Sequence, residues 1–168
     1  MQGIYFHRPM NSESSANWAH SGQGGAFREI GPTKIGVFTI VNALGTVVDR
    51  DGRVVRCSRN DSAKKCPLIS EVLKDSAVRI TERAEQEGPS NNTTITLLVT
   101  NQKLPFADLQ RIAKQVHSSI SRAIQPFATE DDGDVLYAVT TDQVENPDLS
   151  PLDFAVVASE IAWDAVLS

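Results

Sequence analysis

The amino-acid sequence predicts a mixed α/β or α+β fold in a single domain. Apolar, β-branched runs alternate along the chain with longer segments that carry apolar residues at helical spacing, and this alternation is typical of both classes. The length of 168 residues suits one domain. Hydrophobic residues make up 40% of the chain and charged residues 22%, which is the composition of an ordinary globular protein with a substantial core.

Charge and composition narrow the possible partners. The net charge of −5 disfavours nucleic acid and anionic membranes. No apolar run approaches the ~18 residues of a membrane-spanning helix, and residues 1–25 lack the apolar centre of a signal peptide. We therefore expect a cytoplasmic protein. Cys57 and Cys66 are too few for a disulfide framework, so we expect free thiols, no metal and no other cofactor.

The first half of the chain predicts a leader, a strand, a hairpin and a helix. Residues 1–25 are rich in Ser, Asn and Gly and predict a disordered leader before a domain over 26–168. Residues 34–41 predict a buried strand, which the following Asn-Ala-Leu-Gly ends. Residues 46–56 predict a hairpin, because two Val-Val pairs flank an Asp-Gly turn. After a charged loop, residues 70–87 predict a helix that Gly-Pro stops.

The second half predicts two more strands and two helices. Residues 94–100 and 135–141 read as buried strands, separated by an acidic loop at 125–134. The helix between them begins near Pro105, and its apolar stripe contains Phe106, Leu109, Ile112, Val116, Ile120 and Ala123. Ser150 is a good N-cap for a last helix that is apolar nearly all round. The strands are apolar enough to be covered on both faces.

Asn92-Thr93 is the first candidate for chemistry. A Thr hydroxyl can attack the preceding carbonyl in an N-to-O acyl shift, and hydrolysis then frees an N-terminal Thr. That residue carries a nucleophile together with an α-amine of pKa about 7.7–8.0, which can act as its base. The alternative from these residues is a loop between helix and strand, in which Asn and Thr serve turns. N-glycosylation at Asn91 or Asn92 requires a secreted chain, which nothing here indicates.

Three further candidates are polar residues next to strands. Asp132 and Asp134 flank Gly133, and in an extended chain their carboxylates share a face. Such a pair repels or shares a cation or ammonium group; the alternative is a solvated acidic loop. Asn42 ends a strand, where its amide serves an oxyanion or simply a turn. His117 lies at the edge of the helical stripe and reads as a packed or partly exposed helix histidine rather than a catalytic one.

Several segments together resemble peptidase family S58, whose members include 6-aminohexanoate-oligomer hydrolases, the L-aminopeptidase D-Ala-esterase/amidase and β-peptidyl aminopeptidases. They are Val41–Gly45 with its flanks, the Asn-Thr-Thr run before the strand at 94–100, the loop around Gly133, and the last helix. The resemblance covers residues 22–168. It implies a partial four-layer αββα sandwich of the L-aminopeptidase D-Ala-esterase/amidase type.

The same resemblance implies an N-terminal-nucleophile hydrolase. The precursor cuts itself between Asn92 and Thr93, and Thr93 then attacks small amide or peptide substrates through an acyl-enzyme. Asp132 and Asp134 match the family's paired aspartates, which position the nucleophile and its amine, and Asn42 matches its active-site asparagine. Family members often assemble as homo-oligomers of the cleaved heterodimer.

The sequence departs from the family in length. Members are roughly twice as long, and the catalytic lysine that the nylon-oligomer hydrolases place upstream of the asparagine has no counterpart within residues 11–20. If half of the sandwich lies outside this sequence, the strands at 94–100 and 135–141 should expose one apolar face. Two readings follow: a self-cleaving amide hydrolase, or a non-catalytic remnant that acts at most as an interaction partner.

Overall fold

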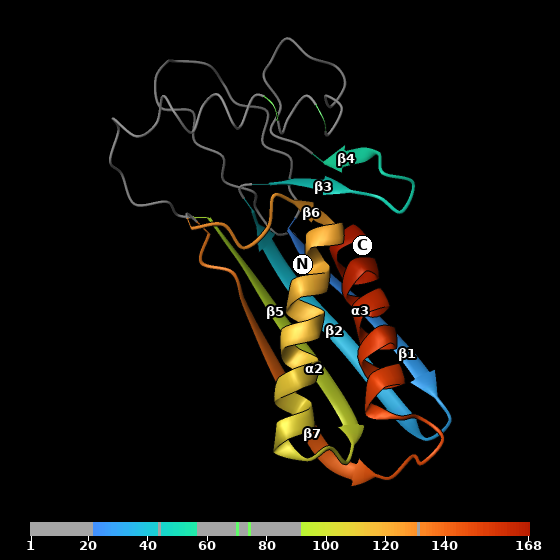
Figure 1. Cartoon of the computed structure of the whole chain (residues 1–168). Coiled ribbons are helices and arrows are strands. Elements are labelled where there is room, and N and C mark those ends of the chain that lie inside the picture. The colour runs from blue at the N-terminus through green and yellow to red at the C-terminus, as the bar shows by residue number, and fades with distance from the viewer. Residues whose placement is uncertain (1–21, 44, 57–69, 71–73, 75–91, 131) are drawn as a thin grey trace.

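The computed structural model describes residues 22–43, 45–56, 70, 74, 92–130 and 132–168. A four-stranded sheet, in the order β1-β2-β5-β7, carries two helices on one face (Figure 1). A second sheet, β4-β3-β6, lies at one end. Cys57, Cys66, residues 1–21 of the predicted leader and, apart from Ser70 and Lys74, the predicted helix at 70–87 lie outside the described residues.

Two antiparallel strands open the described fold. β1 (Gln23–Ile30) pairs along its whole length with β2 (Thr33–Asn42), which contains the predicted strand at 34–41. β1 was not predicted, because Gly24 and Gly25 lower the β propensity of this segment. Its first residues lie within the predicted leader. Gly24 packs against the last helix so closely that a Cβ atom there would lie 2.0 Å from the Ala165 carbonyl oxygen. Glycine is needed at this contact.

The other two strands of the main sheet are parallel to each other. β5 (Thr93–Gln102) pairs antiparallel with β2, and β7 (Val135–Val144) pairs parallel with β5. The chain crosses from β5 to β7 through α2 (Phe106–Ser119), the short 3₁₀ helix η1 (Ile120–Arg122) and β6 (Ile124–Gln125). A parallel pair needs such a crossover, and a helix usually supplies it.

The hydrophobic core lies between this sheet and the two helices. α3 (Pro151–Leu167) packs against β1, β2 and α2, and α2 also packs against β7. The predicted cap of α3 is present, since Ser150 Oγ accepts a hydrogen bond from the Asp153 N–H at 3.1 Å. Fully buried core residues come from both helices and both central strands: Ile35, Val37, Leu98, Ile112, Val116, Phe154 and Ile161.

The opposite face of the sheet is open among the described residues, so the prediction that the strands are covered on both faces is wrong. Cross-strand pairing places the exposed side chains on one face: Phe38 lies opposite Leu97, which lies beside Tyr137. We call this the open face. Its large apolar side chains are between 37% and 61% exposed: Phe27, Phe38, Ile40, Ile95, Leu97, Tyr137 and Val139. The apolar exposure expected for one face of the strands at 94–100 and 135–141 is therefore confirmed.

Two further expectations about burial need correction. β7 was predicted to be a buried strand, but it lies at the edge of the sheet and contains no fully buried residue. Phe106 was placed on the apolar stripe of α2, but it begins the helix and is 79% exposed. The stripe packs against the core from Leu109, which is half-buried, and is fully buried at Ile112 and Val116.

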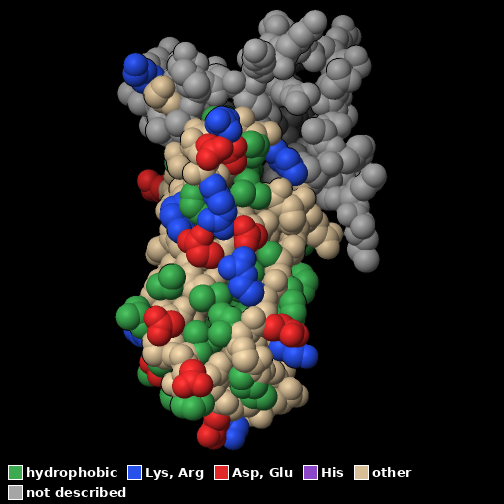
Figure 2. Space-filling view, turned by 90° about the vertical axis from the view of Figure 1, so that its right-hand side faces the viewer, with side chains coloured by type: hydrophobic (Ala, Val, Ile, Leu, Met, Phe, Trp, Pro, Cys, Tyr) green, Lys and Arg blue, Asp and Glu red, His purple; other side chains and the backbone are tan. Residues whose placement is uncertain are grey.

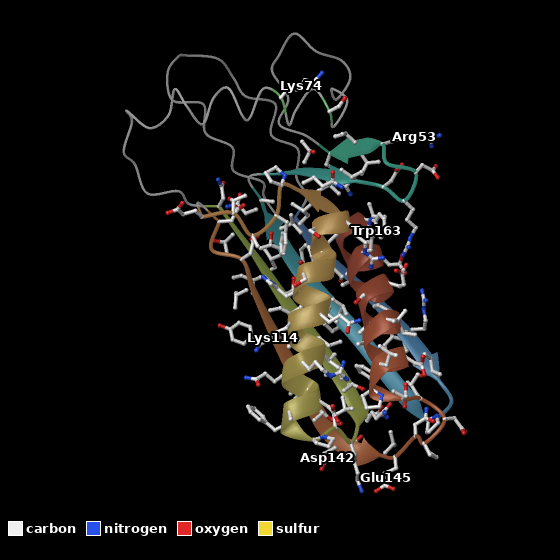
Figure 3. All side chains as sticks on the ribbon, in the orientation of Figure 1. Arg53, Lys74, Lys114, Asp142, Glu145 and Trp163 are labelled. Atoms are coloured by element: carbon white, nitrogen blue, oxygen red, sulfur yellow. The ribbon has the colours of Figure 1, made fainter. Side chains whose placement is uncertain are left out.

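The predicted hairpin forms the second sheet together with β6. β3 (Thr46–Val48) and β4 (Val54–Arg56) are antiparallel, and Gly52 in the turn has a φ of 79°, a left-handed conformation that glycine adopts without strain. The indole N–H of Trp163 donates to the Val48 carbonyl oxygen at 3.1 Å and so ties β3 to α3. Figure 3 labels Trp163 on the part of α3 nearest the hairpin.

Charged side chains surround Trp163. The guanidinium groups of Arg50 and Arg122 each lie 4.8 Å from the centre of the indole ring system, a cation–π distance. Both arginines bind Glu160, and Arg50 also binds Asp164 at 2.7 Å. Positive and negative side chains alternate on this side of the molecule (Figure 2). Hydrogen bonds from Arg50 and then Arg122 hold the pKa of the Glu160 carboxyl below its ordinary value.

Candidate functional site

The candidate site forms at the end of the main sheet where β5 and β7 begin. Because these strands are parallel, their first residues lie at the same edge (Figure 1). Thr93 is the first residue of β5 and pairs with Asn42, the last residue of β2. Asn92 forms an isolated parallel bridge with Asp132. The fold thus brings together residues from three separate parts of the sequence.

The hydroxyl of Thr93 lies against the peptide bond that precedes it. Thr93 Oγ1 donates a hydrogen bond to the Asn92 carbonyl oxygen at 2.6 Å. The same oxygen accepts a second hydrogen bond, at 3.0 Å, from the N–H of Gly133. Both Asn92 and Thr93 are half-buried. A hydroxyl, a carbonyl group and a backbone donor to that carbonyl are therefore gathered at one peptide bond.

The Asp134 carboxylate joins the start of β5 to the loop before β7. One of its oxygens accepts from the Thr94 N–H at 2.5 Å, and the other accepts from the Ala128 N–H at 2.9 Å. Ala128 has a φ of 52°, a left-handed conformation that costs a residue other than glycine about 1–2 kcal/mol. The carboxylate thus fixes the backbone directly after Thr93, and a strained residue supplies its second donor.

Asp132 has a different set of contacts from Asp134. Its carboxylate accepts from the Thr129 hydroxyl at 3.1 Å, and its N–H donates to the Thr129 carbonyl oxygen at 3.0 Å. The sequence suggested two carboxylates that repel or share a cation. The contacts named here come from neutral hydrogen-bond donors, which stabilise the two carboxylates.

The sequence did not single out three of these neighbours. Gly133 was treated as a spacer between aspartates, and Ala128 and Thr129 only as part of an acidic loop. A glycine between two candidate aspartates is a signal that could have been followed, since a Cβ atom at Gly133 would lie 2.9 Å from Thr93 Oγ1. Ala128 contributes through its backbone N–H, which leaves no trace in the side-chain pattern.

His117 does not join the site through hydrogen bonds. Its ring packs 5.1 Å from the ring of Phe127 at an angle of 57°, and its buried Nδ1 atom has no hydrogen-bond partner. This packing agrees with the prediction of a packed helix histidine.

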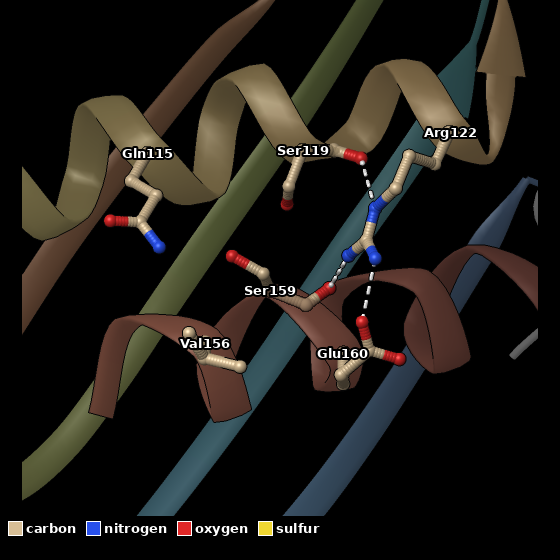
Figure 4. Close-up of a pocket in the computed structure, with 6 residues that line it drawn as sticks. All are labelled: Gln115, Ser119, Arg122, Val156, Ser159 and Glu160. Atoms are coloured by element: carbon tan, nitrogen blue, oxygen red, sulfur yellow. Dashed lines mark hydrogen bonds and ion pairs between the residues drawn. The ribbon is translucent and has the colours of Figure 1, made fainter. Parts of the chain in front are cut away.

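The helix layer contains a separate hollow of about 240 Å³ (Figure 4). The N–H groups of Arg122 at its edge are already engaged: they bind Glu160 Oε1 at 2.6 Å and the carbonyl oxygens of Ser159 and Ser119 at 3.1 and 3.3 Å. The hollow therefore offers a ligand little free hydrogen-bonding capacity. It is lined by Gln115, Ser119, Arg122, Val156, Ser159 and Glu160, none of them a candidate site residue.

Within the described residues, no His, Cys, Asp and Glu side chains form a group of three or more that could hold a metal ion. In the same part of the chain, no helix has the length and apolar character needed to cross a membrane.

Comparison with known proteins identifies the family. The model of peptidase family S58 matches residues 14–167. This chain belongs to peptidase family S58. It is 37% identical over 161 residues to the 6-aminohexanoate-oligomer endohydrolase of Paenarthrobacter ureafaciens, covering 88% of this chain and 43% of that protein. An uncharacterized aminopeptidase of Mycobacterium leprae is 32% identical over 125 residues, covering 70% of this chain and 31% of that protein.

The fold is also similar to that of a solved member of the N-terminal-nucleophile (Ntn) hydrolases. The L-aminopeptidase D-Ala-esterase/amidase of Ochrobactrum anthropi, described as a new variant of the Ntn-hydrolase fold, superposes with a TM-score of 0.50 at 19% identity. The match covers 87% of this chain and 39% of that one. This chain thus has a mixed α/β fold that resembles part of the Ochrobactrum anthropi enzyme. The chain spans less than half the length of each relative named here.

Proposed function

We propose that this chain carries the nucleophile of an S58 amide hydrolase, and that it releases that nucleophile by cutting itself between Asn92 and Thr93. Thr93 then attacks an amide or peptide substrate and forms an acyl-enzyme. The proposal includes the four-layer αββα sandwich of the family. The described sheet and helices supply two layers, and a second sheet with its helices would cover the open face.

One observation carries this proposal: the 2.6 Å contact between Thr93 Oγ1 and the Asn92 carbonyl oxygen. An attacking hydroxyl must lie next to the carbonyl group before the reaction, because positioning removes much of the entropic barrier. Thr93 also begins a rigid, ten-residue strand, which fixes the direction of its side chain. The Asp134 carboxylate accepts a hydrogen bond from the N–H of Thr94, the residue after the nucleophile.

The proposed cleavage takes place in two steps, an acyl shift and the hydrolysis of the resulting ester. First, Thr93 Oγ bonds to the Asn92 carbonyl carbon, the Asn92–Thr93 C–N bond breaks, and the hydroxyl proton ends on the Thr93 nitrogen. Then water adds its hydroxyl to the Asn92 acyl carbon and its proton to Thr93 Oγ. The new α-amine of Thr93 has an unperturbed pKa of about 7.7–8.0, so it can take the proton from its own hydroxyl during later turnovers.

The substrate class follows from the relatives and from the proposed nucleophile. One relative is named for hydrolysis of 6-aminohexanoate oligomers, another as an aminopeptidase. Both names describe hydrolysis of an amide or peptide bond, the reaction that a threonine nucleophile performs. We propose a small amide or peptide as the substrate of this chain, within a homo-oligomer of cleaved heterodimers.

A second function is favoured by the open face. Seven large apolar side chains on one face of a sheet are unusual for a protein that works alone. In this alternative the chain is a non-catalytic member of the family that binds another protein through the open face. It predicts a stable, uncleaved chain.

Intact-mass spectrometry of the purified chain separates the two functions. Self-cleavage gives two fragments that meet between Asn92 and Thr93, and Thr93→Ala leaves one intact chain. Thr141→Ala is the matched control, since Thr141 is an exposed strand threonine at the far end of β7; this variant should cleave like the wild type. A wild-type chain that stays whole over days at neutral pH would contradict self-cleavage and favour the binding function.

A further inference from the structure

The backbone N–H of Gly133 points at the carbonyl group that Thr93 would attack. We propose that this N–H is the oxyanion donor for self-cleavage, stabilising the negative charge that forms on the Asn92 carbonyl oxygen. This inference rests on the proposed function and adds to it one catalytic group, the backbone N–H of a glycine. The group touches the reacting oxygen directly, at 3.0 Å.

The geometry suits a donor that acts during the reaction. When Thr93 Oγ bonds to the carbonyl carbon, the Asn92 oxygen takes up a full negative charge. The Thr93 hydroxyl gives up its proton at that moment and can no longer donate to this oxygen. The Gly133 N–H remains in place, so its hydrogen bond strengthens as charge develops. A fixed backbone donor needs no reorganisation to do this.

The surrounding contacts fix this donor on both sides. Asp132, directly before Gly133, bridges to Asn92 in parallel register, and it is also bound to Thr129 through its own N–H. Asp134, directly after Gly133, holds the Thr94 and Ala128 N–H groups. The two aspartates therefore hold the peptide unit between them, and in this proposal they act as positioning residues for the Gly133 N–H.

The absence of a side chain at residue 133 serves the same purpose. A Cβ atom there would lie 2.9 Å from Thr93 Oγ1 and 3.6 Å from the Asn92 carbonyl oxygen. The first distance is too short for a carbon and a hydroxyl oxygen, so the hydroxyl would have to leave its position. Gly133 does not have a left-handed φ. Close approach to the nucleophile therefore explains glycine here better than backbone conformation does.

Two substitutions test the donor. Gly133→Pro removes the N–H, and cleavage should slow by about 10²-fold or more, as when one oxyanion donor is lost. Gly133→Ala keeps the N–H but displaces the hydroxyl, and cleavage should slow by at least about 10-fold. Gly52→Ala is the control: its Cβ would meet nothing within 4 Å, but its φ of 79° makes it destabilising. It should cleave at the wild-type rate, which excludes a general effect of lower stability.

Hydroxylamine identifies which of the two steps a substitution slows. This nucleophile cleaves an ester at Thr93 once it has formed, so it rescues variants that are slow only in hydrolysis. A donor that acts in the acyl shift predicts no rescue of either Gly133 variant. Rescue to the wild-type rate overturns the inference.

The outcomes separate this inference from the proposed function. If the wild type cleaves and both Gly133 variants cleave within about threefold of it, the donor role is wrong while self-cleavage stands. If the wild type does not cleave, both are overturned. Circular dichroism checks the fold of each variant. If Gly133→Pro does not fold, replacing Gly133 by glycolate, its ester analogue, removes the N–H without adding a Cβ atom, and cleavage of that chain within about threefold of the wild-type rate overturns the donor role.

Discussion

Asn42 and Thr93 face each other directly across β2 and β5, although they are far apart in the sequence. Directly opposed residues in an antiparallel pair point to the same side of the sheet, with Cβ atoms about 4.5–5.5 Å apart. Both residues are half-buried and stand at the edge of the open face. The Asn42 amide is thus within range of any group that reacts at Thr93.

Removing the Asn42 side chain should slow the chemistry. Asn42→Ala is expected to slow self-cleavage, and any amide hydrolysis, by about 10²-fold, because the amide would act as a second donor to the oxyanion beside the Gly133 N–H. Asn101→Ala is the control. Asn101 bonds the backbone of Lys34 at 2.7 Å and of Pro32 at 3.1 Å, so its loss should lower the melting temperature without slowing cleavage. Equal cleavage rates in the two variants would show that Asn42 is only structural.

Replacing Asp134 by asparagine should loosen the start of β5. The carboxylate accepts from two N–H groups, whereas an amide can place only one oxygen there and directs an NH₂ group at the other donor. We expect a loss of about 1–3 kcal/mol in the free energy of unfolding and slower cleavage. Chemical denaturation measures the first, and intact mass the second. Asp108→Asn, which removes a partly exposed ion pair with Arg111 on α2, should change neither.

Replacing Thr94 by valine should stabilise the protein. The Thr94 side chain is buried, and its hydroxyl has no hydrogen-bond partner. A buried, unsatisfied polar group costs about 1–3 kcal/mol, and valine has the same shape without that group. Thr94→Val should raise the midpoint of urea unfolding at an unchanged slope. Thr39→Val, in contrast, should be destabilised, because the Thr39 hydroxyl shares a hydrogen bond with the Thr96 hydroxyl at 3.1 Å.

Acid should destabilise the junction of α3 and the hairpin through Glu160. Its pKa is lowered in the folded protein by hydrogen bonds from Arg50 and Arg122. A depressed folded pKa gives stability that is present above the unfolded value of about 4.5 and is lost as pH falls through the folded value. The melting temperature of the wild type should therefore decrease as the pH is lowered from about 4.5.

Glu160→Gln tests this assignment. It should lower the melting temperature at pH 7 and remove part of the fall in acid, because glutamine does not titrate. The control is Glu145→Gln. The Glu145 side chain is 78% exposed beside Lys103, so its charge should contribute little. Parallel acid curves for the wild type and Glu160→Gln would contradict the prediction.

The open face should cause self-association when nothing else covers it. Phe38→Glu places a charge where an apolar side chain is 56% exposed. We expect this variant to be more monomeric in light scattering and to bind less of an apolar fluorescent dye, with little change in melting temperature. Phe154→Ala, in contrast, removes a fully buried ring and should cost about 3–5 kcal/mol. A wild type that is monomeric and binds no dye would contradict the prediction.

The sequence by itself determined most of the local structure. Apolar periodicity located β2, β5, β7 and the helices α2 and α3, and Ser150 marked the beginning of α3. It also supplied the candidates Asn42, Thr93, Asp132 and Asp134, because nucleophiles and carboxylates are visible as residue types. These signals are local: each depends on a few neighbours along the chain.

Only the tertiary structure decided which side of each strand is covered and which groups meet at Thr93. An apolar run predicts burial but does not name the partner that buries it, so Phe38 and Tyr137 read as core residues and are exposed. Backbone N–H groups have no signature in a sequence, so Gly133 and Ala128 became visible only as donors in space. The physical reason is that register and loop closure bring distant atoms within hydrogen-bonding range, and local periodicity carries no information about that distance.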